Sequence, residues 1–393
     1  MRGFAPLAGS YAINELGDNL GVIALAILVL DRTGSALATT ALFLVGKFLP
    51  AMLAPALTAA LDRRAISRVL PALYVIEAAA FGGLALLADA FWLPGVLALA
   101  FLDGLLAITA RGLSRGAIAA VLTPAGRLRD GNALINVIFA VTGVGGPLLA
   151  GILVTQWGPG TALAADAVSF LAAALMLALT ARHLPAPQRG AREHWRARVR
   201  DGLAYLRGHP TAGRLLVGEA VAIVFFAITV PIEVVYAEES LHAGAFGFGA
   251  LVAAWGVGIL LGSAIFARAQ ERSPVTLVLL STAAVGAGYL VMAVSPGLAL
   301  ACAGAVLGGT GNGVQWVSVM TALQEAVGED YQARAVGLLE SAAAAVPGIG
   351  FVLGGLLTSI VGPRAAYVAA AAGVAVVVVV WIRRPIVPER VVA

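Results

Sequence analysis

The chain has 393 residues, of which 60% are hydrophobic and only 12% are charged, and its mean hydropathy is +0.95. A water-soluble protein of this length could not bury so much apolar surface in one or two cores, whereas a bilayer accepts helices of about 20 apolar residues. The composition therefore excludes an ordinary soluble protein. The pI near 9.6 is explained by basic loops beside a membrane, so we expect no nucleic-acid partner.

Twelve apolar stretches follow one another along the chain, and each is about long enough to cross a bilayer. Backbone amides in lipid must bond within their own segment, so we predict an all-α membrane protein with twelve transmembrane helices. The predicted spans are 8–30, 36–60, 69–88, 92–113, 133–155, 161–182, 215–237, 245–267, 274–295, 298–320, 337–360 and 365–383.

The basic residues predict how these spans are oriented. Lys47 is the only lysine, and when the loops are assigned alternately to the two sides, nearly all arginines fall on one side. Arg111 and Arg115 are counted with this majority, and only Arg32 and Arg364 fall opposite. Positively charged loops stay in the cytoplasm, so we predict a multi-pass protein of the cell membrane with both termini cytoplasmic.

A long polar stretch near the middle of the chain divides the spans into six and six. We therefore predict an N-terminal six-helix bundle over 1–183 and a basic cytoplasmic linker over 184–214. A C-terminal six-helix bundle with a short cytoplasmic tail would occupy 215–393. A membrane-surface helix and a solvated linker are both compatible with the basic stretch.

The two halves of the sequence resemble each other at an offset of 204 residues. The segment 146–153 matches 350–357 in its glycines and leucines, and Gly-Pro follows at 158–159 and again at 362–363. Several matches at one offset favour an internal duplication. Two pseudo-symmetric bundles of this kind predict alternating access to a site near the bilayer midplane.

Four motifs resemble those of the major facilitator superfamily, in its drug:proton antiporter group and the branch of macrolide and siderophore exporters. The loop 58–64 resembles G-x-x-x-D-R, with Thr58 in place of the glycine, and 143–151 resembles a segment that contains G-P-x-x-G-G. Asp166-Ala-Val-Ser-Phe resembles D-A-x-S-F, and the loop with Arg334 and Gly337 resembles G-R-x-x-G.

This resemblance implies an alternating-access transporter, namely a proton-coupled exporter of a lipophilic small molecule such as a drug, a secondary metabolite or a siderophore. It assigns a cytoplasmic latch to Asp62, Arg63 and Arg64, although these residues could simply be topogenic anchors. It also assigns a hinge and seal to the antiporter motif, where ordinary small-residue packing is the alternative. The motif residues are Gly143, Gly146, Pro147 and Gly151.

Ionisable residues inside the predicted spans are the best candidates for proton coupling, because a charge in the membrane is costly unless it is paired or hydrated. Glu15 and Asp18 are three residues apart on one helical face. Lys47, Glu77 and Asp103 lie in spans 2, 3 and 4. We expect Asp18 to carry or gate the proton opposite Lys47, with a static buried ion pair as the alternative.

The second half offers weaker candidates for the substrate cavity, namely Glu233, Asn312, Gln315 and Trp316. We expect Glu219 to meet Arg214. An apolar cavity with a few acids suits a lipophilic substrate, which is sometimes cationic.

We predict no metal, no cofactor and no catalytic residue, and we expect a monomer whose partners are a small-molecule substrate, protons and lipid. Cys302 is the only cysteine, and no phosphate-binding loop is present. Two other functions stay open in principle. One is a facilitator or importer of a polar metabolite or sugar. The other belongs to a different class, a membrane-embedded enzyme or a transport-dead sensor.

Overall fold

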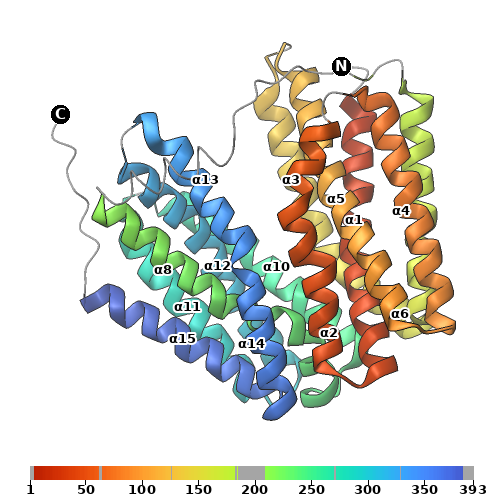
Figure 1. Ribbon diagram of the computed structural model, residues 1–393. Coiled ribbons are helices and arrows are strands. Elements are labelled where there is room, and N and C mark those ends of the chain that lie inside the picture. The colour runs from red at the N-terminus through yellow and green to blue at the C-terminus, as the bar shows by residue number, and fades with distance from the viewer. Residues whose placement is uncertain are drawn as a thin grey trace. The chain divides into compact units, whose positions relative to one another are not determined.

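A computed structural model describes residues 4–61, 64–124, 126–181, 184, 209–269, 271–327 and 329–383, and every element in these ranges is a helix (Figure 1). The first helices are α1 (Phe4–Thr33), α2 (Ala36–Phe43), the π-helix η1 (Leu44–Phe48), α3 (Leu49–Leu61), α4 (Ile66–Asp89), α5 (Leu93–Leu122) and α6 (Leu128–Leu179). Next come α8 (Pro210–Ala227), η3 (Val230–Ile232), α9 (Glu233–Val235), η4 (Tyr236–Ser240), α10 (Gly244–Arg268), α11 (Pro274–Val294), α12 (Leu298–Glu325), α13 (Glu329–Ala345), α14 (Pro347–Ile360) and α15 (Pro363–Arg383).

The described residues form two compact units. The first lies within Met1–Gly190 and Ala243–Ala253, and the second within Ala191–His242 and Ala254–Ala393. The helix α10 therefore begins in the first unit and ends in the second. Its first turns pack on α6, where a Cβ atom at Gly249 would meet the carbonyl of Pro147.

Ten helical segments in the described part of the chain are long and apolar enough to cross a membrane. One of them, Leu134–Leu179, contains a break at Gly158, where φ is 81° and ψ is 164°, and a second helical arm follows. The 28-residue helix α12 is not among the ten, because glycines and the polar Asn312 and Gln315 lower its hydropathy. The prediction of an all-α protein is confirmed, and each predicted span coincides with helix over most of its length.

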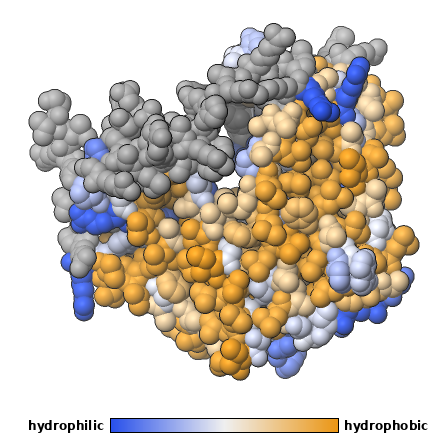
Figure 2. Space-filling model, viewed as in Figure 1, coloured by the Kyte–Doolittle hydropathy of each residue, from blue (hydrophilic) through white to orange (hydrophobic). Residues whose placement is uncertain are grey.

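The outer surface of the helices is apolar. Large hydrophobic side chains are strongly exposed, including Leu86, Leu179 and Ile360 at 76%, 74% and 79%. Figure 2 shows apolar residues over much of the visible face, with hydrophilic residues toward the helix ends. A soluble monomer rarely exposes apolar patches of this extent, so a lipid environment accounts for the surface.

The core of the first unit depends on glycines in α1. A Cβ atom at Gly21 would lie 2.6 Å from the ring of Phe81, which stacks on Phe170 with centroids 5.5 Å apart. The lack of side chains on this face of α1 lets α4 and α6 approach closely, as small residues do in membrane helices. Polar side chains on the neighbouring face of α1 are thereby held at fixed positions in the interior.

Glycines play the same part in the second unit. A Cβ atom at Gly288 of α11 would lie 2.5 Å from the backbone nitrogen of Gly308 in α12. Trp255 of α10 stacks on Tyr289, with centroids 5.4 Å apart. The close contact of α11 and α12 fixes the position of Gln315 on α12.

A π-helical turn interrupts the second membrane segment. It covers Leu44–Phe48 and contains Lys47, between the α-helical segments α2 and α3. A π-helical turn holds one residue more than an α-helical turn and is common at functional sites. Here it lies against α5, where a Cβ atom at Gly104 would meet the carbonyl of Gly46.

Matching positions of the internal repeat have matching structural roles. Gly158 and Gly362 both have positive φ, at 81° and 112°, and each precedes a proline that begins a helix. Arg32 donates a hydrogen bond to the carbonyl of Ala88 at 2.5 Å. At the offset of 204, Tyr236 donates to the carbonyl of Met292, also at 2.5 Å. These shared contacts support an internal duplication.

Candidate functional site

An ion-pair cluster inside the first unit joins α1 to α5. Arg111 Nε forms an ion pair with Glu15 Oε1, and Arg111 Nη2 donates to Asp18 Oδ2 at 2.7 Å. Glu15 and Asp18 are 1% and 5% exposed, whereas the Arg111 side chain is 31% exposed. Asn14 Nδ2 also donates to Asp18 Oδ2, at 3.2 Å. One guanidinium thus holds two buried carboxylates.

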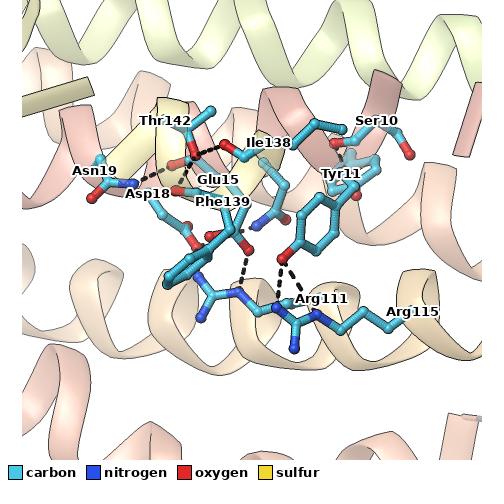
Figure 3. Close-up of polar contacts among 12 residues, drawn as sticks. Ser10, Tyr11, Glu15, Asp18, Asn19, Arg111, Arg115, Ile138, Phe139 and Thr142 are labelled. Carbon is cyan, nitrogen blue, oxygen red and sulfur yellow. Dashed lines mark hydrogen bonds and ion pairs between the residues drawn. The ribbon is translucent and has the colours of Figure 1, made fainter. Parts of the chain in front are cut away.

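Helical spacing explains how this cluster forms. Tyr11, Glu15 and Asp18 lie on one face of α1, and Arg111 and Arg115 are four residues apart on α5. Arg115 donates to the hydroxyl of Tyr11 at 2.7 Å, and its guanidinium lies 5.5 Å from the ring centroid. Figure 3 shows both arginines directed from one helix toward the side chains of the other. The two contacts fix an antiparallel register between α1 and α5.

The expected pairing of Asp18 with Lys47 does not occur, because among the described residues the ion-pair partner of Asp18 is Arg111. Arg111 lies well inside α5, which continues to Leu122, beyond the end of the predicted span 92–113. The two arginines that were counted with the loops, Arg111 and Arg115, therefore both lie within a helix. The apolar residues after Arg115, Gly-Ala-Ile-Ala-Ala-Val-Leu, are the feature of the sequence that indicates this longer helix.

Lys47 instead lines a cavity together with Asp103. The cavity has a volume of about 20 Å³, and Val22, Leu25, Leu42, Phe43, Gly46 and Ala100 complete its lining. Asp103 is 7% exposed, and its Oδ1 atom has no hydrogen-bond partner among the described residues. This volume holds about one water molecule, so the cavity is too small for a small-molecule substrate, although its lining is mostly apolar with a few polar groups, as in such sites.

Two more carboxyl groups are buried in the first unit. Glu77 on α4 is fully buried, and neither of its oxygens has a hydrogen-bond partner among the described residues. Asp166, on the second arm of α6, accepts a hydrogen bond from Ser169 Oγ at 2.9 Å. Its other oxygen lies 3.4 Å from the position of a Cβ atom at Gly21. Asp166 was known from the sequence only as part of a motif, not as a buried acid.

The residues of the antiporter motif lie on the first arm of α6 and differ in their surroundings. A Cβ atom at Gly146 would be 2.7 Å from the Cβ of Asn19 on α1, and one at Gly151 would be 2.9 Å from the carbonyl of Ala245. Pro147 is buried, whereas Gly143 has open space beside it. Gly146 and Gly151 therefore permit close helix contacts, and Gly143 does not need to be a glycine for packing.

Two of the three predicted latch residues, Asp62 and Arg63, lie outside the described residues. Arg64 is exposed, and together with Arg68 it lines a groove of about 600 Å³ between the end of α3 and the start of α4. The structure therefore shows the base of the loop but not the contacts that a latch would make.

The candidates of the second unit do not form one site. Gln315 is fully buried and donates from Nε2 to Glu219 Oε2 at 3.0 Å, so the expected Glu219–Arg214 contact is wrong. Arg214 instead donates to the carbonyl of Pro210. Glu233 and Asn312 are half-buried, and Trp316 is 39% exposed on α12.

Comparisons with known proteins identify the fold. Residues 215–392 match the family model described as Major Facilitator Superfamily. No curated protein matches the chain. Among solved structures, a point mutant of the nucleoside transporter NupG is 13% identical, with a TM-score of 0.78 over 96% of this chain and 98% of that one.

Two other solved structures are similar over almost their full lengths. A bacterial homologue of the iron transporter ferroportin is 15% identical, with a TM-score of 0.75 over 96% of this chain and 97% of that one. The peptide-transporter-family structure PepTSo is 10% identical, with a TM-score of 0.75 over 97% of each chain. The chain therefore has the fold of these transporters, and its many apolar helices make it a multi-pass membrane protein.

Proposed function

We propose that this chain is a member of the major facilitator superfamily and exports a lipophilic small molecule in exchange for protons. The observation that carries the proposal is the ion pair of Arg111 with Glu15 and Asp18 in the interior of a helical unit. An interior charge cluster is costly in a membrane protein and usually has a function.

The cluster is suited to couple protonation to movement. Arginine stays charged at all physiological pH values, so the carboxylates are the groups that can change their charge. A proton on Asp18 removes the charge that holds Arg111 Nη2 at 2.7 Å and weakens the contact between α1 and α5. Loss of the proton restores the contact. A helix pair whose contact depends on protonation can bias a two-state transporter.

The lining of the cavity with Lys47 and Asp103 favours a largely apolar substrate, which would need a wider opening than the volume of about 20 Å³ in this structure. Six of its eight lining residues carry no charge and are apolar or glycine, and the two charged groups can orient a polar substituent. Drugs, secondary metabolites and siderophores with apolar bodies fit this description better than a sugar, which needs many hydrogen-bonding partners.

We also propose twelve membrane spans in two bundles, in the cell membrane, with cytoplasmic termini. The break at Gly158 turns the segment Leu134–Leu179 into two arms, and the 28 residues of α12 are enough to cross a bilayer. These two additions to the ten apolar segments support the count of twelve. The contacts shared at the offset of 204 support alternating access by two related halves.

The test is transport by purified protein in liposomes under an imposed pH gradient. The readouts are a fluorescent lipophilic cation such as ethidium and a pH-sensitive dye in the lumen. Asp18→Asn mimics the protonated acid and should still bind the cation but lose uphill accumulation and coupled proton flux. Asp89→Asn, at an exposed acid of α4, is the matched control and should behave like the wild type. Uphill accumulation by Asp18→Asn at the wild-type level would place coupling elsewhere, with Glu15 and Asp103 as the next candidates.

A further inference from the structure

The internal repeat relates the ion pair of the first unit to a different pair in the second unit. Glu15 and Arg111 correspond, at the offset of 204, to Glu219 and Gln315, and the two partners are 96 residues apart in both units. Both glutamates are buried, at 1% and 2% exposure. The glutamate and the position of its partner are therefore the same in both units. The partner is an arginine in the first unit and a neutral amide in the second.

The surroundings of Glu219 provide no compensating charge. Glu219 is the only buried acid among the described residues of the second unit. The described charged residues on α8 and on the elements packed against it are Arg214, Glu325, Glu340, Arg364 and Arg383. Cys302 and Tyr367 are the neutral titratable groups on those elements, and the side chains of Glu329, Asp330, Tyr331 and Arg334 on α13 are not described. No described residue forms an ion pair with Glu219, and its hydrogen-bond partner is Gln315.

An unfilled hydrogen bond at Gln315 indicates the protonation state of Glu219. Gln315 Nε2 donates to Glu219 Oε2 at 3.0 Å, but the buried Gln315 Oε1 has no hydrogen-bond partner in the described part of the chain. A carboxylate can only accept, whereas a carboxylic acid also has an O–H donor. A protonated Glu219 supplies the donor that Gln315 Oε1 lacks and avoids an unpaired charge in the interior.

We infer that Glu219 is a second proton-binding site, at which Gln315 pairs with the neutral carboxylic acid. The residue at the partner position decides the state of the repeated glutamate. Arg111 stabilises the ionised form of Glu15, and Gln315 stabilises the protonated form of Glu219. A role for this proton in the transport cycle rests on the proposed function, whereas the protonation of Glu219 does not.

Infrared spectroscopy of the full-length protein in lipid tests the inference directly, because protonated carboxyl groups have a carbonyl stretch separate from that of carboxylates and shifted in D2O. Glu219→Gln should remove intensity equal to one carboxyl group from the protonated band. The matched control Glu15→Gln, at the equivalent position, should leave that band unchanged and reduce the carboxylate bands. An unchanged protonated band in a folded Glu219→Gln protein would overturn the inference.

A second variant keeps the test decisive if Glu219→Gln does not fold. Gln315→Arg recreates the arrangement of the first unit, so the protonated band should lose the same intensity while the glutamate is retained. No loss in this variant would also overturn the inference. Transport of ethidium by the Asp18 variants is measured separately, so failure of the proposed coupling at Asp18 cannot be mistaken for failure of proton binding at Glu219.

Discussion

Replacing Arg111 by glutamine should destabilise the first unit, because it removes the cation that pairs with two buried carboxylates in the described part of the chain. Removal of one partner from a buried ion pair costs about 3–5 kcal/mol. The lower value of about 3 kcal/mol is appropriate, because the Arg111 side chain is 31% exposed and water can partly replace it. For a unit of this size, about 3 kcal/mol corresponds to a fall in Tm of roughly 6–12 °C.

The assay is thermal unfolding of the purified variants in lipid nanodiscs. The variant Arg111→Gln with Glu15→Gln and Asp18→Asn removes all three charges of the Arg111 ion pairs and leaves only Arg115, which contacts Tyr11, so it should recover most of the lost stability. Such recovery is the non-additivity expected of residues that share one network. A single variant Arg111→Gln that unfolds at the wild-type temperature would refute the reasoning. So would a triple variant no more stable than the single one.

The other predictions concern the latch, the topology and helix packing. Asp62→Asn should reduce ethidium transport without reducing the amount of protein in the membrane, and wild-type turnover would make the loop a simple topogenic anchor. A reporter active only in the cytoplasm should give signal when fused at Ala393, whereas activity of a periplasmic reporter there would reverse the topology. Gly354→Ala should lower thermal stability by about 1–3 kcal/mol, because its Cβ atom would meet the carbonyl of Ile228. Gly337→Ala should leave thermal stability unchanged, because Gly337 has open space beside it. An equal loss of stability in the two variants would contradict the packing argument.

Much of the fold could be predicted from the sequence, because each membrane helix satisfies its own backbone and depends little on distant residues. The shared face of Glu15 and Asp18 on α1 could be predicted for the same reason, because residues three positions apart lie on one side of a helix. The turn at Gly158 also followed from local chemistry, because glycine adopts a positive φ and proline begins a helix.

The partners of the buried acids could not be predicted in this way. The ion pair of Asp18 and Arg111 joins residues 93 positions apart, so it depends on how α1 and α5 pack. Counting charges by loop treated Arg111 as an anchor, because it lies near the end of the predicted span 92–113, whereas the helix continues to Leu122. The repeat held an unused signal, since applying the offset of 204 to Glu15 leads directly to Glu219.

The π-helical turn at Leu44–Phe48 acts as a phase shift within the second membrane segment. Each residue of an α-helix turns the chain by about 100°, so the extra residue of the turn rotates all of α3 relative to α2. Loss of a single residue here would turn a different face of α3 toward α5 while α2 kept its position. The length of this segment, and not only its composition, therefore determines which side chains α3 directs toward α5.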